Sequence, residues 1–458
     1  MAEKNNRFND ESEKKRQPKR SARGERHAAA KEKNAADRRV VSYEDVPIDK
    51  YDEPTPIQPE LIKKLLKVLL IIFACVILLL VILNWENLSP DNVSRFIQYD
   101  LLGISQGDGY PSSINGNEVT DGNFALMDEK TPIYVSDTSI VLLNDNAGQR
   151  QNLGNAFAKP ILRTSRDYSM VFNVGGTGLR ILSHSDELYN LSLKNKIFCA
   201  DISASGVFAA VTQSDDYLAK LTVYSKDNTE KYAYSFADYY INNISINSDG
   251  TRAIVSGISA QKGSLVSSVY ILDFSQDAYI AKYELKDNSI YDVKFFDNGN
   301  AAAIGKNESY FFDIENNKKN LISYDSKTIT NYEVSNEKGI ALSLAKYPDG
   351  RDCEIVTISP EGKTTATIST DIKVESISNA DKAVAVSSGD TIYLYDKESG
   401  KLTAQKKCEQ TLKKIAMAND NTVYALGATE IIKAEMNSTV TVSYTHLTLP
   451  DDLIGVDL

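Results

Sequence analysis

The sequence predicts an all-β protein, a β-propeller of eight four-stranded blades, preceded by a single transmembrane helix and a disordered N-terminal tail. Three observations lead to this fold class. A strand rich in β-branched and aromatic residues recurs eight times, turns that contain glycine separate the strands, and one uninterrupted apolar run at residues 68–83 precedes all of them. Short strands that alternate with such turns are typical of consecutive antiparallel hairpins.

The recurring strand predicts the number of blades. Its copies lie about 37 to 47 residues apart, and four strands with their turns need roughly 40 to 50 residues. Eight copies therefore predict eight blades. Seven blades is the alternative, because the first and last units are the least regular and ring closure commonly borrows a strand from the other terminus. The copies are residues 139–144, 178–183, 221–225, 269–273, 310–314, 355–359, 392–396 and 431–435.

The segments between these copies fit the same scheme. Two further strands, at residues 197–202 and 207–212, are joined by the turn 203–206, which ends in glycine. The turns at residues 247–250 and 297–299 repeat this arrangement. Tight hairpins need a positive φ, which glycine adopts without steric cost. We therefore expect these strand pairs to be the two inner strands of their blades.

The apolar run is long enough to cross a membrane. From Leu65 to Leu83 it has nineteen residues with one lysine near its start, about 28 Å as a helix against a hydrocarbon thickness of roughly 30 Å. Basic residues flank it almost only on the N-terminal side, which predicts a cytoplasmic N-terminus. The alternative, a cleaved signal peptide, lacks a small-residue cleavage site at residues 84–86. We therefore predict a signal anchor at residues 61–84 in the cell membrane.

The remaining segments differ in composition. Residues 1–60 hold few large apolar side chains and are predicted to be a disordered, basic cytoplasmic tail. A juxtamembrane amphipathic helix and linker is expected at 85–109, and the extracytoplasmic propeller at 110–441. Residues 442–458 resemble a translated sequencing adapter and are predicted to be non-native. One basic cluster in the tail is a candidate for contact with anionic lipid, with a solvated topology signal as the alternative: Lys14, Lys15, Arg16, Lys19 and Arg20.

Charge and cysteine content set further bounds. The net charge of −11 combines 17 basic and 13 acidic residues before Val68 with 34 basic and 49 acidic residues from there on. We expect no nucleic-acid partner for an acidic domain outside the cell. Four cysteines, one of them Cys75 in the apolar run, do not form a disulfide framework. Buried thiols are expected for Cys199, Cys353 and Cys408, with one pairing among them as the alternative.

Signals for catalysis are few, and we predict no catalytic, cofactor-binding or metal-binding residue. His184 is the one histidine outside the two terminal tails, and no G-x-S-x-G nucleophile elbow accompanies it. Together with Asp186 and Glu187 it is a candidate set of metal ligands. The alternative, which we expect, is an exposed hairpin turn between the third and fourth strands of a blade.

Three other patterns have ordinary explanations. The glycine-rich residues 175–178 join two strands and open no helix, so they do not predict a phosphate site. Paired carboxylates at 215–216 and 451–452 are typical of a solvated surface. Of the 25 tyrosines, 23 follow the apolar run, including residues 232, 234, 239, 240, 279 and 283. Strand packing explains most of them, and an aromatic binding surface is the alternative.

The order of segments resembles that of a known family. A basic tail, one span, a short helix, the stretch Gly107-Asp108-Gly109-Tyr110-Pro111 and repeating all-β units resemble uncharacterised single-pass membrane proteins of Gram-positive bacteria. The resemblance implies a propeller-like extracytoplasmic domain of unknown function and covers about residues 65–436. More distantly, the repeats resemble WD40-like and quinoprotein-like propellers. Quinoprotein blades carry regular tryptophans, whereas this sequence has only Trp85, so we expect no quinone cofactor.

These observations predict a membrane-anchored extracytoplasmic propeller that binds a protein or glycan, or acts as a scaffold, in the cell envelope. One alternative is a hydrolase or lyase that processes envelope polymers, with its site at the propeller channel. Another is a transmembrane sensor. Three or more charged side chains that converge on a pocket at the channel would favour the enzyme.

Overall fold

The computed structural model of the protein describes residues 59–83 and 107–436, which belong to two separate compact units. In the first unit, helix α2 spans Pro59–Leu83 and contains the apolar run. Proline suits the first position of a helix, where its missing N–H has no intrahelical partner. Among the described side chains of α2, those from Leu66 to Leu79 are exposed.

Within the described ranges, no helix meets both the length and the hydropathy required to cross a membrane.

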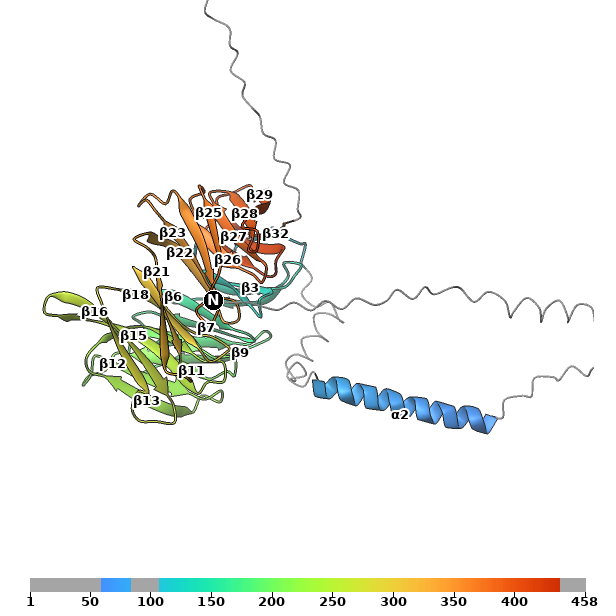
Figure 1. Ribbon diagram of the computed structural model, residues 1–458. Coiled ribbons are helices and arrows are strands. Elements are labelled where there is room, and N and C mark those ends of the chain that lie inside the picture. Colours follow the sequence, from blue (N-terminus) through green and yellow to red (C-terminus); the bar gives the residue numbers. More distant parts are fainter. Residues whose placement is uncertain (1–58, 84–106, 437–458) are drawn as a thin grey trace, which may run out of the picture. The chain divides into compact units, whose positions relative to one another are not determined.

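The second unit is an eight-bladed propeller, in which thirty-two strands at residues 107–436 form eight antiparallel four-stranded sheets (Figure 1). Blades one to four comprise β2 (Val119–Met127), β3 (Thr131–Ser136), β4 (Ser139–Leu143), β5 (Gln149–Gly154); β6 (Pro160–Ser165), β7 (Tyr168–Asn173), β8 (Gly178–Leu182), β9 (Glu187–Ser192); β10 (Ile197–Ile202), β11 (Phe208–Thr212), β12 (Ala219–Tyr224), β13 (Glu230–Phe236); and β14 (Tyr240–Ile246), β15 (Arg252–Gln261), β16 (Ser264–Asp273), β17 (Ala281–Lys286). Blades five to eight comprise β18 (Ile290–Phe295), β19 (Ala301–Gly305), β20 (Glu308–Asp313), β21 (Lys318–Ser323); β22 (Thr328–Ser335), β23 (Gly339–Ala345), β24 (Cys353–Ile358), β25 (Thr364–Thr370); β26 (Ser376–Asn379), β27 (Ala383–Ser388), β28 (Thr391–Asp396), β29 (Leu402–Lys407); and β30 (Lys414–Met417), β31 (Thr422–Leu426), β32 (Glu430–Glu435), with β1 (Ser112–Ser113).

The N-terminal strand closes the ring. β1 pairs antiparallel with β32, Ser112 opposite Ile431, and so supplies the fourth strand of the last blade. The inner strands of the first and last blades, β2 and β30, are in contact. Pairing of the N-terminal strand with the last blade therefore closes the ring, and the described cysteines form no disulfide bond.

Each interface between neighbouring blades holds one of eight hydrophobic clusters formed by the described residues. Side chains alternate between the two faces of a strand, so one strand serves two interfaces. In β19, Ala301 and Ala303 pack towards blade four, whereas Ala302 and Ile304 pack towards blade six. The small alanines suit the crowded inner part of the ring.

The structure confirms the predicted blade scheme. All eight recurring strands are third strands of their blades, and the predicted inner pairs are first and second strands. The turn glycines have positive φ, +82° at Gly206, +72° at Gly250 and +83° at Gly299. The alternative of seven blades is wrong, although the expected borrowing of a strand does occur.

Several predictions lie outside the described residues. These are the disordered tail and its basic cluster, the juxtamembrane helix predicted within residues 85–109, of which the structure describes only 107–109, and the adapter-like segment 442–458. They stay predictions, as does the membrane topology.

Candidate functional site

The candidate site is a cavity of about 590 Å³ at the centre of the ring. Its lining residues come from the inner strands of all eight blades and from the turns that follow these strands. Since each blade contributes one short stretch, residues far apart in the sequence meet there. The wall is unusually polar for a site between packed sheets, and six charged side chains line its interior: Arg163, Asp201, Asp292, Lys294, Glu333 and Lys414.

Part of this polarity holds the ring together. Inner strands are edge strands whose channel-side N–H groups have no partner within their own sheet. In five blades, a polar side chain of the inner strand accepts a hydrogen bond from a backbone N–H of the next inner strand. The acceptor–donor pairs are Asn123–Leu162 at 3.1 Å, Asp201–Ile246 at 2.8 Å, Ser245–Phe295 at 3.1 Å, Glu333–Asn379 at 2.5 Å and Ser378–Met417 at 2.9 Å.

Burial acts on the three interior carboxyl groups in the same direction. It raises the pKa of Asp201, Asp292 and Glu333 above their ordinary values, because removal from water disfavours the charged form. Positive charge on the interior bases partly offsets this effect, with Lys294 the main one for Asp201, Arg163 for Asp292 and Lys414 for Glu333. The interior acids therefore contribute less negative charge to the cavity than their number suggests.

These raised pKa values predict a loss of stability with rising pH. The folded chain keeps protons on these groups to higher pH than the unfolded chain, in which aspartate titrates near 3.9. Their stabilising contribution is complete below about pH 4 and is lost as the pH rises through the folded pKa values. We expect Asp201→Asn, which keeps an oxygen acceptor for the Ile246 N–H, to reduce this loss. Urea unfolding at several pH values measures it.

The control for this experiment is Asp215→Asn, which removes one charge from an exposed loop. We expect it to leave the dependence of stability on pH as in the parent. A steeper pH dependence for Asp201→Asn than for the parent would contradict the assignment.

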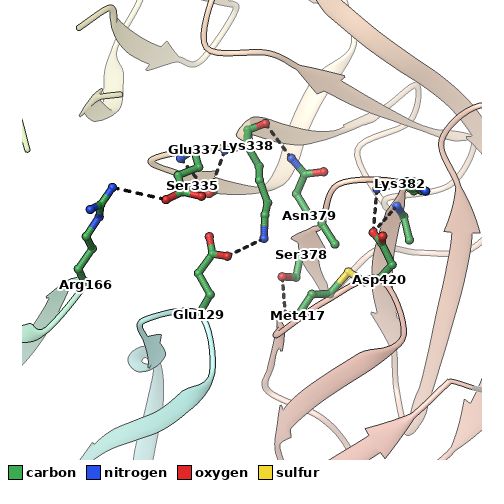
Figure 2. Close-up of polar contacts among 12 residues, drawn as sticks. Glu129, Arg166, Ser335, Glu337, Lys338, Ser378, Asn379, Lys382, Met417 and Asp420 are labelled. Atoms are coloured by element: carbon green, nitrogen blue, oxygen red, sulfur yellow. Dashed lines mark hydrogen bonds and ion pairs between the residues drawn. The ribbon is translucent and has the colours of Figure 1, made fainter. Parts of the chain in front are cut away.

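Ion pairs cross one mouth of the channel, at the turns after the inner strands (Figure 2). Arg166 of blade two lies 3.7 Å from Glu337 of blade six. It also lies 3.4 Å from Asp297 of blade five. Lys338 of blade six lies 3.0 Å from Glu129 of blade one. These partners belong to blades that are three or four positions apart in the ring, so the pairs reach across the mouth. We call this group of five residues the latch.

The latch is expected to be weak. Half-exposed ion pairs are typically worth about 0.2–1 kcal/mol, and the Glu129 side chain is 44% exposed. We expect a double-mutant cycle of Glu129→Gln and Lys338→Met to give a coupling energy in this range, falling towards zero near 1 M salt, where the screening length is about 3 Å. The same cycle on Arg351 and Asp349, an exposed pair in the turn between β23 and β24, serves as reference. A coupling that is insensitive to salt would contradict this description.

Backbone bulges re-aim side chains at the opposite mouth, where the inner strands begin. The pairing of inner and second strands skips one residue at the same place in blades three to six: Phe198, Asn242, Tyr291 and Thr330. Bulges are common at barrel rims, where they turn a side chain out of the regular pattern. Asn242 is fixed there by hydrogen bonds to the Ser256 hydroxyl at 2.9 Å and to the Ile290 carbonyl at 3.3 Å.

His184 lies between β8 and β9, the third and fourth strands of blade two, as predicted, but the prediction that it is exposed is wrong. Its side chain is 5% exposed, and Nε2 lies 3.4 Å from both Asp128 and Asp167. These acids stand in turns of blades one and two that adjoin the latch, which cover the imidazole. Neither predicted partner, Asp186 or Glu187, is among the acids within ion-pair distance of His184 in the described part of the chain, and Glu187 instead pairs with Arg180 at 2.6 Å.

The remaining sequence candidates lie away from the cavity. Residues 175–178 join β7 and β8, and Asp215 and Asp216 are exposed in a loop of blade three; residues 451–452 lie outside the described part. Cys199, Cys353 and Cys408 are buried free thiols, as expected. The tyrosines divide, since residues 232 and 239 are buried, residues 234 and 283 are half-buried, and residues 240 and 279 are exposed. Among the described residues, no group of three or more ligands suits a metal ion.

Sequence reasoning missed the interior charges of the channel. Arg163, Lys294 and Lys414 lie on strands with few other charges, and a lysine within a buried inner strand such as residues 290–295 is itself a signal. The glycine-containing turns indicate the hairpins, whereas the charged side chains of the cavity lie on the inner strands that precede these turns. Which charges meet follows only from the ring.

The fold and the cavity define a closed eight-bladed propeller with a polar central channel. The chain belongs to the family of unknown function DUF5711, whose model matches residues 112–436. No protein with a curated description has a significant match to this chain.

Several solved propellers are similar in structure. The C-terminal WD40 domain of Sif2 is 12% identical with a TM-score of 0.51, over 72% of this chain and 100% of that domain. AztD from Citrobacter koseri in its apo form is 11% identical with a TM-score of 0.46, over 70% of this chain and 90% of that one. BamB from Moraxella catarrhalis is 11% identical with a TM-score of 0.45, over 71% and 99% respectively. At such identity the likeness to the first establishes the fold alone.

Proposed function

We propose that the protein is a membrane-anchored extracytoplasmic propeller that binds a partner protein on blades four and five. The observation that carries this is the uneven distribution of exposed apolar side chains. Nine large ones are exposed on the described propeller, and six of them lie in these two blades: Tyr240, Leu265, Tyr279, Ile280, Tyr291 and Leu321. Clustered exposed apolar residues mark interaction surfaces more often than scattered ones do.

Three of these side chains share one face. Tyr240 begins the inner strand β14 and Tyr291 stands at the bulge of β18. Leu265 lies on the hairpin between β15 and β16, which returns to the side where inner strands begin. These two strands have ten residues each, longer than the other strands of the propeller, and in Figure 1 their hairpin extends beyond the neighbouring blades. We call Tyr240, Leu265 and Tyr291 the docking face.

A protein partner is favoured over a glycan by the mixture of residues. Tyrosine suits either partner, but exposed leucine gains most from burial against another apolar side chain. The polar groups beside the face, including Asn242, can supply hydrogen bonds at the rim of such an interface.

Site-specific photocrosslinking in intact cells tests this proposal. A photoreactive residue at Tyr240 or Tyr291 is expected to give a discrete, protease-sensitive adduct, whereas one at Tyr347 or Leu188, exposed on other blades, is expected to give none. An adduct that a glycan hydrolase removes and a protease does not would show a glycan partner instead. Equal labelling from all four positions would contradict a dedicated face.

The membrane anchor in this proposal is supported by the apolar run at residues 65–83 and by Lys63, Lys64 and Lys67 on its N-terminal side. An impermeant thiol reagent tests the topology. We expect it to label Glu398→Cys, an exposed loop position of the propeller, in intact protoplasts. Ser42→Cys is expected to be labelled only after permeabilisation. Labelling of both variants only after permeabilisation would contradict an extracytoplasmic propeller.

An enzyme that acts at the channel is the second candidate function. The convergence of six charged side chains on the cavity favours it, because buried acids with raised pKa are suited to donate protons. If so, the chain releases soluble fragments from isolated wall polymer, and Asp292→Asn abolishes the release. Release that continues unchanged in Asp292→Asn would exclude the channel as its site.

A further inference from the structure

Lys294 does not fit the structural scheme of the inner strands. Asp201, Ser245 and Ser378 are the next-to-last residues of β10, β14 and β26, and each accepts a backbone N–H from the next blade. Lys294 is the next-to-last residue of β18. An ammonium group has no acceptor. Lysine at this position therefore cannot make the hydrogen bond that joins neighbouring inner strands.

Arg163 and Lys414 are further bases on the same wall. Arg163 donates one hydrogen bond from Nη1 to the Leu162 carbonyl oxygen at 3.1 Å, although a guanidinium has five N–H donors. All three bases are partly exposed to the cavity. None of the ion pairs formed by the described propeller residues includes any of them.

The acids on this wall are already engaged. Asp201 accepts the Ile246 N–H and Glu333 accepts the Asn379 N–H, both from the next blade. Asp292 accepts the Val293 N–H at 2.8 Å. Each carboxylate is thus held by backbone, while the nearby bases keep free donors that point to no carboxylate within ion-pair distance. The cavity therefore offers three cationic side chains whose hydrogen-bond donors are not taken up by its carboxylates.

We propose that the central cavity binds a small organic anion, a molecule with carboxylate or phosphate groups, through Arg163, Lys294 and Lys414. Charge-assisted hydrogen bonds from these three blades would hold the anion. A volume of about 590 Å³ falls within the range of small-molecule sites, roughly 300–1,000 Å³. This site is separate from the docking face and does not depend on a protein partner.

The two mouths of the channel differ as routes for this ligand. The latch crosses one mouth with Arg166 and Lys338 reaching to acids of distant blades. The ligand therefore enters through the opposite mouth, past the bulges that carry Asn242 and Tyr291. Both residues are exposed there.

Calorimetric titration of the full-length chain in detergent micelles tests the site, with succinate and inorganic phosphate as anionic probes and glucose as a neutral one. We expect saturable binding of at least one anion at low ionic strength and none of glucose. Loss of one charge-assisted hydrogen bond should weaken that anion by about tenfold or more in Lys294→Met and in Arg163→Met. Lys306→Met, an exposed position in the same blade, is the matched control and should bind as the parent.

Two measurements keep the outcome clear. Lys294→Arg keeps the charge and should keep most of the affinity, which separates loss of charge from loss of structure, and thermal melting reports whether each variant is folded. Binding that is equal in Lys294→Met and the parent would overturn the proposal. Equal weakening of anion binding by Lys306→Met would also overturn it. So would the absence of saturable binding of either anion at concentrations up to about 10 mM, which corresponds to a binding free energy weaker than about 3 kcal/mol.

Discussion

Phe208→Ala is expected to lower the free energy of unfolding by about 3–5 kcal/mol, the cost of truncating a buried aromatic side chain in a core that relaxes only partly. Phe208 begins β11 and has no exposed surface. Its ring stacks on Tyr224 at a centroid distance of 4.9 Å. It belongs to the cluster between blades two and three, which also contains Phe172. Loss of the ring therefore leaves a cavity at an interface on which ring closure depends.

Urea unfolding followed by far-ultraviolet circular dichroism measures this effect. The control is Tyr217→Ala, a truncation of similar size in the same blade at a side chain that is exposed. We expect the control to change stability by less than about 0.5 kcal/mol. Phe208→Leu should fall between the two, because leucine fills part of the space. Equal effects of Phe208→Ala and Tyr217→Ala would show that this interface contributes little to stability.

The blades could be predicted because their signals are local. A third strand such as residues 392–396 is recognisable from β-branched and aromatic residues within one short window, and Gly250 or Gly299 marks a hairpin by itself. The register of eight repeats then follows from spacing. By contrast, β1 has only two residues, too few for any periodic pattern, so its place in the last blade could not be found.

The site could not be predicted because it has no local signal of its own. Arg163 and Lys294 stand on the inner strands of blades two and five, and only ring closure brings both to one cavity. A single charge in a strand is ambiguous, since half of the strand positions face solvent in most sheets. In a propeller, however, inner strands are covered on both faces. Once a strand is known to be the inner strand of a blade, a lysine within it indicates a charged position in the central cavity.

The burial of His184 could not be predicted either, because it depends on contacts between blades. His184 lies in the predicted turn between the third and fourth strands of its blade. Such turns are usually exposed. The imidazole is buried because Asp128 and Asp167, from turns of two different blades, lie against it. The Asp128 N–H also bonds to the Arg166 carbonyl oxygen at 3.1 Å, which joins these turns. These contacts join turns that are distant in the sequence, so the residues around position 184 do not predict them.

Gly339→Ala is the second substitution for which we expect a large effect. Gly339 opens β23 with φ of +83°, and a Cβ atom there would lie 2.0 Å from the carbonyl oxygen of Ile358. That oxygen belongs to β24, whose residue Ile358 is paired with Ile340. Alanine can be accommodated only if the two strands separate locally, which also disturbs the turn that carries Glu337 and Lys338.

Gly299 provides a matched control, because its φ is also +83° while no atom lies within 4 Å of the position that a Cβ would take. Gly299→Ala should cost about 1–2 kcal/mol, the penalty of an L-residue in the left-handed region. Gly339→Ala carries this penalty and the strand separation as well, so its unfolding midpoint in urea should be clearly lower. Equal midpoints would mean that β23 and β24 yield without cost at this point. A lower midpoint for Gly339→Ala would instead show that the close approach of these two strands is rigid.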